Sequence, residues 1–444
     1  MYTTTAASWY VVMTLKGELV QVAPAVYPAA PSEFTHACAL KNYDEAHLLV
    51  APTVAGRSSG LAYKWDWRND TYAPIGGNRT EWGCHDIQWS ALHADSFWVP
   101  NSAAAQCHDG RNANVSRVNA TSGAVLETVA SGYSECRSDV NHAQLVEDDA
   151  AVLFSLREMS ALAKYYVNGT RAWTIGGFEG EWPIRDFDRA VVYPPGASVW
   201  FYQHNAEFMS PDEIWMFDNS GLGNQSRLLI VRVNETAKEA QLEWEYRLGK
   251  HSQIYGDCDP TPAGNVLGSW WDVTFGNASA DAQAQSGVVE VVRATKEVAW
   301  KLDIVGRACP TSTCHSSHAA DLDAAHPDRS QVWLMYSVER FYDAPVLPSP
   351  GSDFGAPACA GGSLVFVVFD SFKASSMRPG TFALTEHRTG LVAMTGTFEF
   401  EPHWRPTSIS RHIDANVDGL LVQLEVKNSR GRAARFAFTC DSSR

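Results

Sequence analysis

The sequence predicts an all-β fold, a six-bladed β-propeller with a histidine-lined funnel at its centre; seven blades are the alternative. Aromatic residues make up 11% of the chain, with 16 Trp, 15 Tyr and 19 Phe, and such side chains favour strands and sheet-on-sheet packing. A strand-pair pattern recurs along the chain, whereas helical periodicity is nearly absent. Because radial repetition lets one domain exceed the usual size limit, a single domain is predicted over residues 1–444.

Each repeat begins with an extended segment, continues through a short turn and ends in an apolar strand. The repeats begin at His36, His85, His142, His204, Gly256 and His318. A period of about 50 to 60 residues made of strand pairs is typical of propeller blades. Within one repeat, the Asn168-Gly169 turn separates two apolar runs and predicts a two-residue hairpin.

The repeat weakens after residue 345. Residues 345–362 are rich in Pro, Gly and Ala and are predicted to form a loop before the closing blade. The apolar run from Leu364 to Phe369 is predicted as a strand of that blade. The first strand, Trp9 to Met13, is expected to join the last blade and close the ring.

Five of the six repeats begin with histidine, which predicts a shared site. The innermost strand of each propeller blade lines the central channel, so equivalent positions of successive blades form a ring. We therefore expect the five histidines to converge, although each could instead only cap a strand. Imidazole can act as an acid, a base, a nucleophile or a metal ligand.

Charge and motif composition restrict the partners and the compartment. The net charge of −15 disfavours nucleic-acid binding, and no apolar run is long enough to span a membrane. Nine cysteines allow four disulfides. Together with eight Asn-x-Ser/Thr acceptors, they predict a secreted or secretory-lumen, N-glycosylated protein. The acceptors are Asn69, Asn78, Asn114, Asn119, Asn168, Asn224, Asn234 and Asn277.

An ordered set of motifs in residues 139 to 271 resembles the arylsulfotransferase family. The first group is Asp139-Val-Asn-His142, then Leu153-Phe-Ser-Leu-Arg157 and Trp173-Thr-Ile-Gly-Gly177. The second group is Tyr202-Gln-His204, then Trp215-Met-Phe-Asp-Asn219 and Ser226-Arg227. Trp244-Glu-Tyr246 and Gly264-Asn-Val-Leu-Gly268 continue the set in the same order.

The resemblance implies a PAPS-independent sulfotransferase with a propeller fold and no cofactor. Such an enzyme transfers a sulfuryl group from an aryl sulfate to a phenol through a sulfohistidine intermediate. The chemistry suits the residue types, because guanidinium and imidazolium groups stabilise an anionic transition state. The expected partners are therefore a small aryl sulfate and a phenol, and the oligomeric state is left open.

The resemblance also assigns site residues. His142 and His204 match the two motif histidines, and Arg227 matches the family arginine. The sulfo-accepting histidine has two candidates, His318 and His251, of which His318 is preferred because it shares the repeat register. The predicted catalytic residues are thus His142, His204, Arg227, His318 and His251. The predicted substrate-binding residues are His85, Arg157, Asn219 and Asp257.

Two other functions remain open from the sequence. One is a propeller lyase or hydrolase that uses the same histidines, with or without a metal. The segment 309–328 is dense in Cys, His and Asp, which are zinc and manganese ligands, but Cys309 and Cys314 are equally suited to a local disulfide. No metal ligand is therefore assigned. The other function is a non-catalytic extracellular propeller that binds a glycan or a protein.

Overall fold

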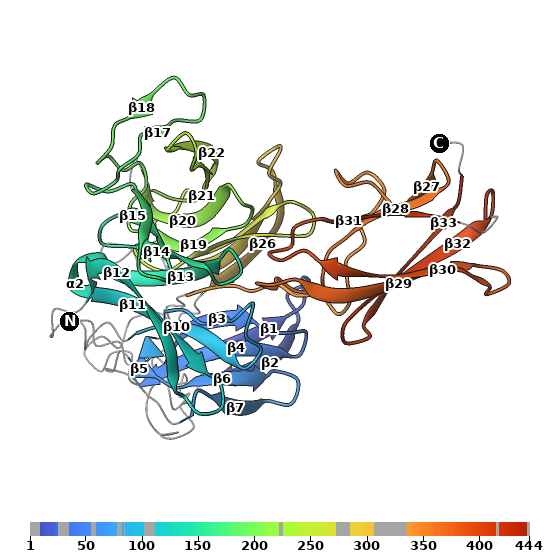
Figure 1. The fold of residues 1–444 in the computed structure, drawn as a ribbon, viewed down its shortest axis with the longest axis horizontal. Helices are drawn as coiled ribbons and strands as arrows, with labels where there is room; N and C mark the ends of the chain where they lie inside the picture. The colour runs from blue at the N-terminus through green and yellow to red at the C-terminus, as the bar shows by residue number, and fades with distance from the viewer. Residues whose placement is uncertain are drawn as a thin grey trace. The chain divides into compact units, whose positions relative to one another are not determined.

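The computed structural model of the protein consists almost entirely of β-strands (Figure 1). It describes residues 9–24, 35–54, 59–77, 82–83, 85–101, 112–221, 225–271, 285–305, 335–413 and 417–441. Two compact units divide the chain. The first comprises Met1–Asp259 and Val266–Glu339, and the second comprises Pro260–Asn265 and Arg340–Arg444. The single domain over residues 1–444 stays a prediction.

Five sheets follow one another along the first unit, each with a body of four strands. The first contains β3 (Thr35–Asn42), β4 (His47–Val54), β6 (Ala62–Asp66) and β7 (Thr71–Ile75), with the short β5 (Ser59–Gly60) and β8 (Trp82–Gly83). The second contains β9 (Gln88–Trp89), β10 (Ser96–Pro100), β11 (Asn112–Asn119) and β12 (Val125–Ser134). The third contains β13 (Val140–Val146), β14 (Ala151–Leu156), β15 (Ala161–Tyr166) and β16 (Arg171–Ile175).

The remaining sheets of this unit repeat the plan. The fourth contains β19 (His204–Phe208), β20 (Glu213–Gly221), β21 (Gln225–Asn234) and β22 (Glu239–Arg247), extended by β17 (Ile184–Arg185) and β18 (Val192–Tyr193). The fifth contains β23 (Asp257–Pro260), β24 (Val266–Trp271), β25 (Gln285–Val291) and β26 (Val298–Val305). A two-stranded sheet pairs β1 (Trp9–Met13) with β2 (Leu19–Pro24), and one short helix, α2 (Glu135–Ser138), precedes β13.

Burial along the strands explains why the sheets stack. All six residues of β14 are buried, as expected for a strand covered on both faces. The fourth strand of the next sheet, β22, instead alternates buried and half-buried residues along most of its length. The strands that begin each sheet therefore lie inside the unit, and the later strands reach its surface.

Four apolar cores lie between consecutive sheets. Each joins residues of one sheet to residues of the next, as Leu49 and Phe97, Trp98 and Phe154, Leu153 and Ile214, and Leu228 and Trp270 illustrate. The all-β prediction is confirmed, and this serial face-to-face stacking is what blades require. No sheet closes on itself among the described residues, so six blades and a closed ring stay predictions.

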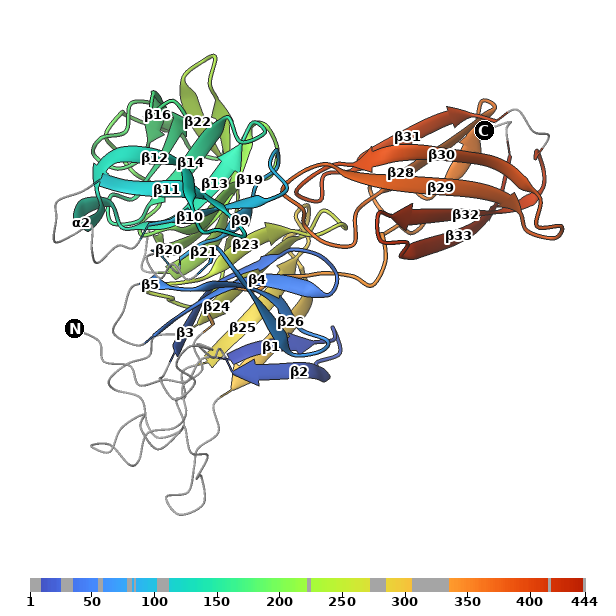
Figure 2. The same cartoon turned by 60° about the horizontal axis from the view of Figure 1, so that its bottom comes forward.

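The second unit has its own core between two sheets (Figure 2). One sheet has the order β27 (Ala358–Ala360), β28 (Ser363–Val368), β31 (Thr407–His412). The other has the order β30 (Val392–Phe400), β29 (Arg378–Glu386), β32 (Leu421–Asn428), β33 (Ala433–Thr439). The Cys359–Cys440 disulfide joins β27 to the residue after β33. The loop predicted at 345–362 is irregular up to β27, and β28 covers most of the predicted strand.

Candidate functional site

The innermost strands of the first unit meet at one pocket. It is small and partly open to solvent, with about 20 Å³ of space for the centre of a water-sized molecule. Its lining is Ala39, Leu40, Lys41, His85, Asn141, His142, His204, Asn205, Gly256, Tyr336 and Ser337. The structure thus brings together three of the histidines predicted to converge. Of the other two, the side chain of His36 and all of His318 lie outside the described residues.

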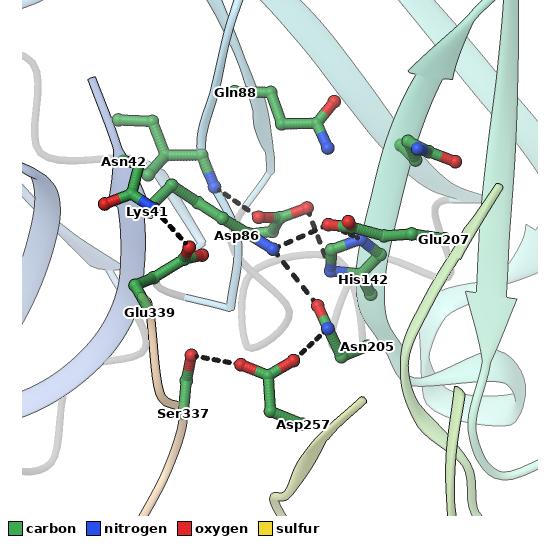
Figure 3. Close-up of polar contacts among 12 residues, drawn as sticks. Lys41, Asn42, Asp86, Gln88, His142, Asn205, Glu207, Asp257, Ser337 and Glu339 are labelled. Carbon is green, nitrogen blue, oxygen red and sulfur yellow. Dashed lines mark hydrogen bonds and ion pairs between the residues drawn. The ribbon is translucent and has the colours of Figure 1, made fainter. Parts of the chain in front are cut away.

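His142 lies between two buried carboxylates (Figure 3). Its Nδ1 is 3.1 Å from Asp86 Oδ2, and its Nε2 is 3.0 Å from Glu207 Oε1. The Nε2 contact is an ion-pair distance rather than a well-aligned hydrogen bond. The His142 side chain is only 3% exposed.

A buried polar network extends from His142 to three further strands (Figure 3). Lys41 on β3 donates to Glu207 at 2.6 Å and to the Asn205 side-chain oxygen at 3.1 Å, both on β19. The Asn205 amide donates to Asp257 at the start of β23. Asp257 also accepts from the Ser337 hydroxyl at 2.8 Å. Because each charge has a partner of opposite sign or a donor, the network can be buried without an isolated ion.

His204 is held in one tautomer by its neighbours. Its Nδ1 is 2.8 Å from Asn219 Oδ1, which can only accept, so Nδ1 carries the proton. The backbone N–H of Tyr255 donates to Nε2 at 3.3 Å. Burial is the largest cause that lowers the pKa of His204, to about 3, while the hydrogen bond with Asn219 acts in the opposite direction. The ring is therefore neutral across the physiological range.

Asn219 also fixes the loop beside His204. Its amide donates to the carbonyl oxygens of Ser252 at 2.9 Å and Tyr255 at 2.8 Å. Asn219 and Asp257, both predicted to bind substrate, are buried and hydrogen-bonded to protein groups. Their direct contact with substrate stays a prediction.

One residue that lines the pocket, Asn205, has a left-handed backbone with φ of 45°. Asp139, Tyr202 and Tyr255, each within two residues of a lining residue, have φ of 45°, 55° and 64°. Such conformations also occur away from the pocket, at Glu147 and Trp404 for example.

His85 differs from the other pocket histidines. Its ring is half-buried and lines the pocket. Its carbonyl oxygen accepts from the Tyr336 hydroxyl at 3.0 Å. Among the described residues, its ring nitrogens have no hydrogen-bond or ion-pair partner. The backbone of His85 is thus anchored while its ring is available.

Arg157 supplies a positive charge close to His204. Its Nη1 is 3.0 Å from Asp139 Oδ2 and also contacts Glu158. The guanidinium lies over the Tyr202 ring, 5.3 Å from the centroid, and its buried Nε has no hydrogen-bond partner among the described residues. Its charge contributes to lowering the pKa of His204. Arg157 is not among the residues that line the pocket, and its predicted contact with substrate stays a prediction.

Arg227 lies in β21, within the fourth sheet. Its Nε is 2.8 Å from Asp218, its Nη1 is 2.5 Å from Glu245, and its Nη2 donates to the Val199 carbonyl. Burial by itself would lower the pKa of Arg227, but Asp218 and Glu245 outweigh it and raise the pKa. All three guanidinium nitrogens have protein acceptors, so the predicted catalytic role has no support from its position.

His251 is also outside the lining of the pocket as far as the structure describes it. It is half-buried, and its Nε2 is 3.3 Å from the Ser220 hydroxyl. Its catalytic role stays a prediction, as does that of His318. The segment 309–328, which is dense in Cys, His and Asp, lies outside the described residues.

Sequence reasoning missed Lys41, Asp86, Asn205 and Glu207. Asp86 directly follows His85, and Asn205 and Glu207 lie within three residues of His204, so their closeness to histidines that begin repeats could have indicated a role in the site. Lys41 carried none, because its role depends on a contact with a residue 166 positions away.

Two features are absent from the part of the chain that the structure describes. No group of three or more His, Cys, Asp or Glu side chains there is arranged to hold a metal ion. No described helix is long and apolar enough to cross a membrane.

The fold and the pocket define an all-β protein that presents histidines at the meeting point of stacked sheets. The predicted family resemblance is confirmed: residues 138–313 match the arylsulfotransferase (ASST) family model. The matched segment covers less than half of the chain, and it contains His142, Arg157 and His204. No curated protein matches the chain.

Solved structures resemble the chain only distantly. A putative 6-phosphogluconolactonase from Bacteroides uniformis is 12% identical, covering 87% of this chain and 94% of its own, with a TM-score of 0.34. The periplasmic gluconolactonase of Pseudomonas aeruginosa is 12% identical, covering 67% and 77%, with a TM-score of 0.36. A protein from Lactobacillus plantarum is 12% identical, covering 67% and 91%, with a TM-score of 0.38. At this level of similarity no activity transfers to this chain.

Proposed function

We propose that this protein is a PAPS-independent arylsulfotransferase. It moves a sulfuryl group from an aryl sulfate to a phenol through a sulfohistidine intermediate. The observation that carries the proposal is the pocket, where His85, His142 and His204 converge close to Arg157, three of the four within the segment that matches the family.

The pocket chemistry supports sulfuryl transfer in two ways. The guanidinium of Arg157 offers N–H donors and a positive charge to the oxygens of a sulfate ester, whose negative charge the transition state redistributes. A neutral imidazole offers the lone pair needed for attack on sulfur. Lys41 already pairs with Glu207 in the network at His142, so that carboxylate adds little repulsion against an anionic donor.

A direct assay tests this proposal. The protein is incubated with 4-nitrophenyl sulfate, with and without a phenol acceptor, and nitrophenol and the sulfated acceptor are measured. We expect nitrophenol release that depends on the acceptor and matches the sulfated product in amount. Replacement of His204 by Ala should lower kcat/KM by about a hundredfold or more. His93→Gln is the matched control, because His93 is exposed and outside the pocket.

Other outcomes of the assay would point to the other functions. Nitrophenol release without any sulfated acceptor indicates a hydrolase. No turnover across a panel of aryl sulfates, together with full activity of His204→Ala on another substrate, would contradict the proposal. Binding to a glycan array without catalysis would favour a binding protein.

We also propose that the protein passes through the secretory pathway. The Cys359–Cys440 disulfide supports an oxidising compartment. Among the sequons, Asn168 is exposed in the connection 167–170 between β15 and β16, and Asn69 and Asn234 are exposed, as glycosylation requires. Peptide mass mapping of protein from its natural source should show a glycan on Asn168. An unmodified Asn168 together with reduced Cys359 and Cys440 would contradict this.

A further inference from the structure

The three histidines of the pocket differ in whether their ring nitrogens are free to react. A nucleophilic imidazole needs a nitrogen lone pair that no other group occupies. Two of the rings have a partner on each nitrogen, whereas the third has none among the described residues. This difference identifies the histidine suited to attack sulfur.

Neither ring nitrogen of His142 is open to a substrate, because the side chain is only 3% exposed. Both of its nitrogens face carboxylate oxygens, at 3.1 Å from Asp86 and 3.0 Å from Glu207. Glu207 is itself fixed by Lys41 at 2.6 Å, so the ring cannot turn away without breaking a buried ion pair. His142 therefore serves as a fixed part of the pocket floor.

His204 has one lone pair, and it is already used. Nδ1 carries the proton that is donated to Asn219, and Nε2 accepts from the Tyr255 backbone. The residue is 5% exposed, and an attack by Nε2 would require loss of the Tyr255 hydrogen bond. A neutral, fixed ring of this kind is suited to shaping the pocket.

His85 combines an anchored carbonyl group with a ring that has no hydrogen-bond or ion-pair partner in the part of the chain that the structure describes. The Tyr336 hydroxyl holds its carbonyl oxygen at 3.0 Å. The next residue, Asp86, accepts from the backbone N–H groups of Ile87 at 2.8 Å and Ala143 at 3.3 Å. These contacts hold the main chain that directly follows the His85 side chain, which lines the pocket. His85 and His204 line the same pocket.

We propose that His85 is the nucleophile that carries the sulfuryl group, an assignment that rests on the proposed function. A ring nitrogen of neutral His85 forms the N–S bond as the S–O bond to the aryl group breaks, and the aryl oxide leaves with the electron pair. The acceptor phenol oxygen then attacks sulfur, the N–S bond breaks, and its electron pair returns to His85. The proton lost by the acceptor phenol balances the one gained by the released aryl oxide.

The first test measures ring availability without turnover. The native protein is treated briefly with diethyl pyrocarbonate, which acylates neutral imidazoles, and the modified peptides are quantified by mass spectrometry. We expect His85 to react at least about tenfold faster than His142 and His204, because their ring nitrogens are occupied. Equal or slower reaction of His85 would overturn the assignment, whatever the outcome of the sulfotransferase assay.

The second test locates the sulfuryl group. The enzyme is mixed with an aryl sulfate in the absence of acceptor, quenched at alkaline pH, and its peptides are mapped. We expect the added mass on His85, and we expect His85→Gly to lose about a thousandfold in kcat and to recover activity with added imidazole. His93→Gln should keep full activity.

The two proposals fail in distinguishable ways. Turnover with the sulfuryl group on His142, His204, His251 or His318 would overturn the role of His85 while the sulfotransferase function stands. Absence of any turnover would overturn both. Circular dichroism and thermal unfolding of His85→Gly show whether its loss of activity reflects misfolding, and the mapping on the native protein does not depend on that variant.

Discussion

Asn219 and Tyr255 decide which form of His204 the folded protein contains. The side-chain oxygen of Asn219 needs a proton on Nδ1, and the backbone N–H of Tyr255 needs a lone pair on Nε2. Protonation of His204 would turn the second contact into a clash of two donors in a buried site. The hydrogen bonds with Asn219 and Tyr255 therefore keep the His204 ring neutral in the folded protein.

The pKa of His204 predicts a specific dependence of stability on pH. Its folded-state pKa of about 3 lies below the usual value of 6.5. Between these values the unfolded chain binds a proton that the folded chain does not, so the free energy of unfolding falls as the pH falls. The stabilisation that the neutral His204 ring contributes is fully present above about pH 6.5. Between pH 6.5 and pH 3 the free energy of unfolding falls by about 1.4 kcal/mol per pH unit.

Urea unfolding at several pH values checks this slope. We expect His204→Gln to remove about 1.4 kcal/mol per pH unit of the dependence in that window, whereas His93→Gln should keep the slope of the natural protein. The carboxyl groups titrate in all three proteins, so their contribution to the pH dependence cancels when the proteins are compared. The same slope in His204→Gln and the natural protein would argue against a neutral buried ring.

At the scale of elements, the turn that leads into β23 depends on Gly256. Its φ is +110°, and a Cβ atom there would lie 2.5 Å from the Phe217 ring. Phe217 is fully buried in the core between the fourth and fifth sheets, so it has no room to move. Gly256 therefore allows two sheets to approach each other at the pocket.

Substitution of this glycine should be costly. We expect Gly256→Ala to lower the free energy of unfolding by about 2–4 kcal/mol, from backbone strain and overpacking together. Gly249→Ala is the matched control, because its φ is +66° and nothing lies within 4 Å of the new Cβ; a loss of about 1 kcal/mol is expected. Equal losses in the two variants, measured by denaturant unfolding, would show that Phe217 does not limit this turn.

The elements also show what sequence could predict. The first residues of the sequence repeats predicted the innermost strands. They also predicted that His85, His142 and His204 lie in one pocket, because equivalent positions in the strands of stacked sheets meet. The direction in which each side chain points could not be predicted from the sequence. Arg227 follows a family motif, yet its guanidinium forms ion pairs with Asp218 and Glu245. The partners of a buried charge depend on which side chains meet across neighbouring strands, and no local sequence pattern shows this.

At the scale of the whole molecule, one disulfide closes a long loop in the second unit. Cys359 and Cys440 are 81 residues apart in sequence, with Cα atoms 5.0 Å apart. Closing a loop of this length removes conformational entropy from the unfolded chain, and this stabilises the folded unit by about 4 kcal/mol. The unit also has a continuous apolar core, so it should remain folded, though less stable, without the bond.

Paired cysteine variants check this. We expect the Cys359→Ala/Cys440→Ala substitution to lower the free energy of unfolding of the second unit by about 4 kcal/mol. Hydrogen exchange of the backbone amides in β29 and β32 measures this change. Transfer activity should be unchanged, since all lining residues of the pocket belong to the first unit. A loss of activity without a loss of stability would show that the disulfide has another role.

The contacts that form the pocket are far apart in sequence. Lys41 and Glu207 are separated by 166 residues, Tyr336 and His85 by 251, and Asn42 and Glu339 by 297. High contact order slows folding, because loop entropy is lost before the long-range contacts form. A nascent chain therefore contains His142 and His204 well before Tyr336 is synthesised, and only then can Tyr336 anchor His85. A chain that is only partly synthesised has the three histidines but cannot yet form the pocket, so the pocket becomes reactive only after Tyr336 has been added.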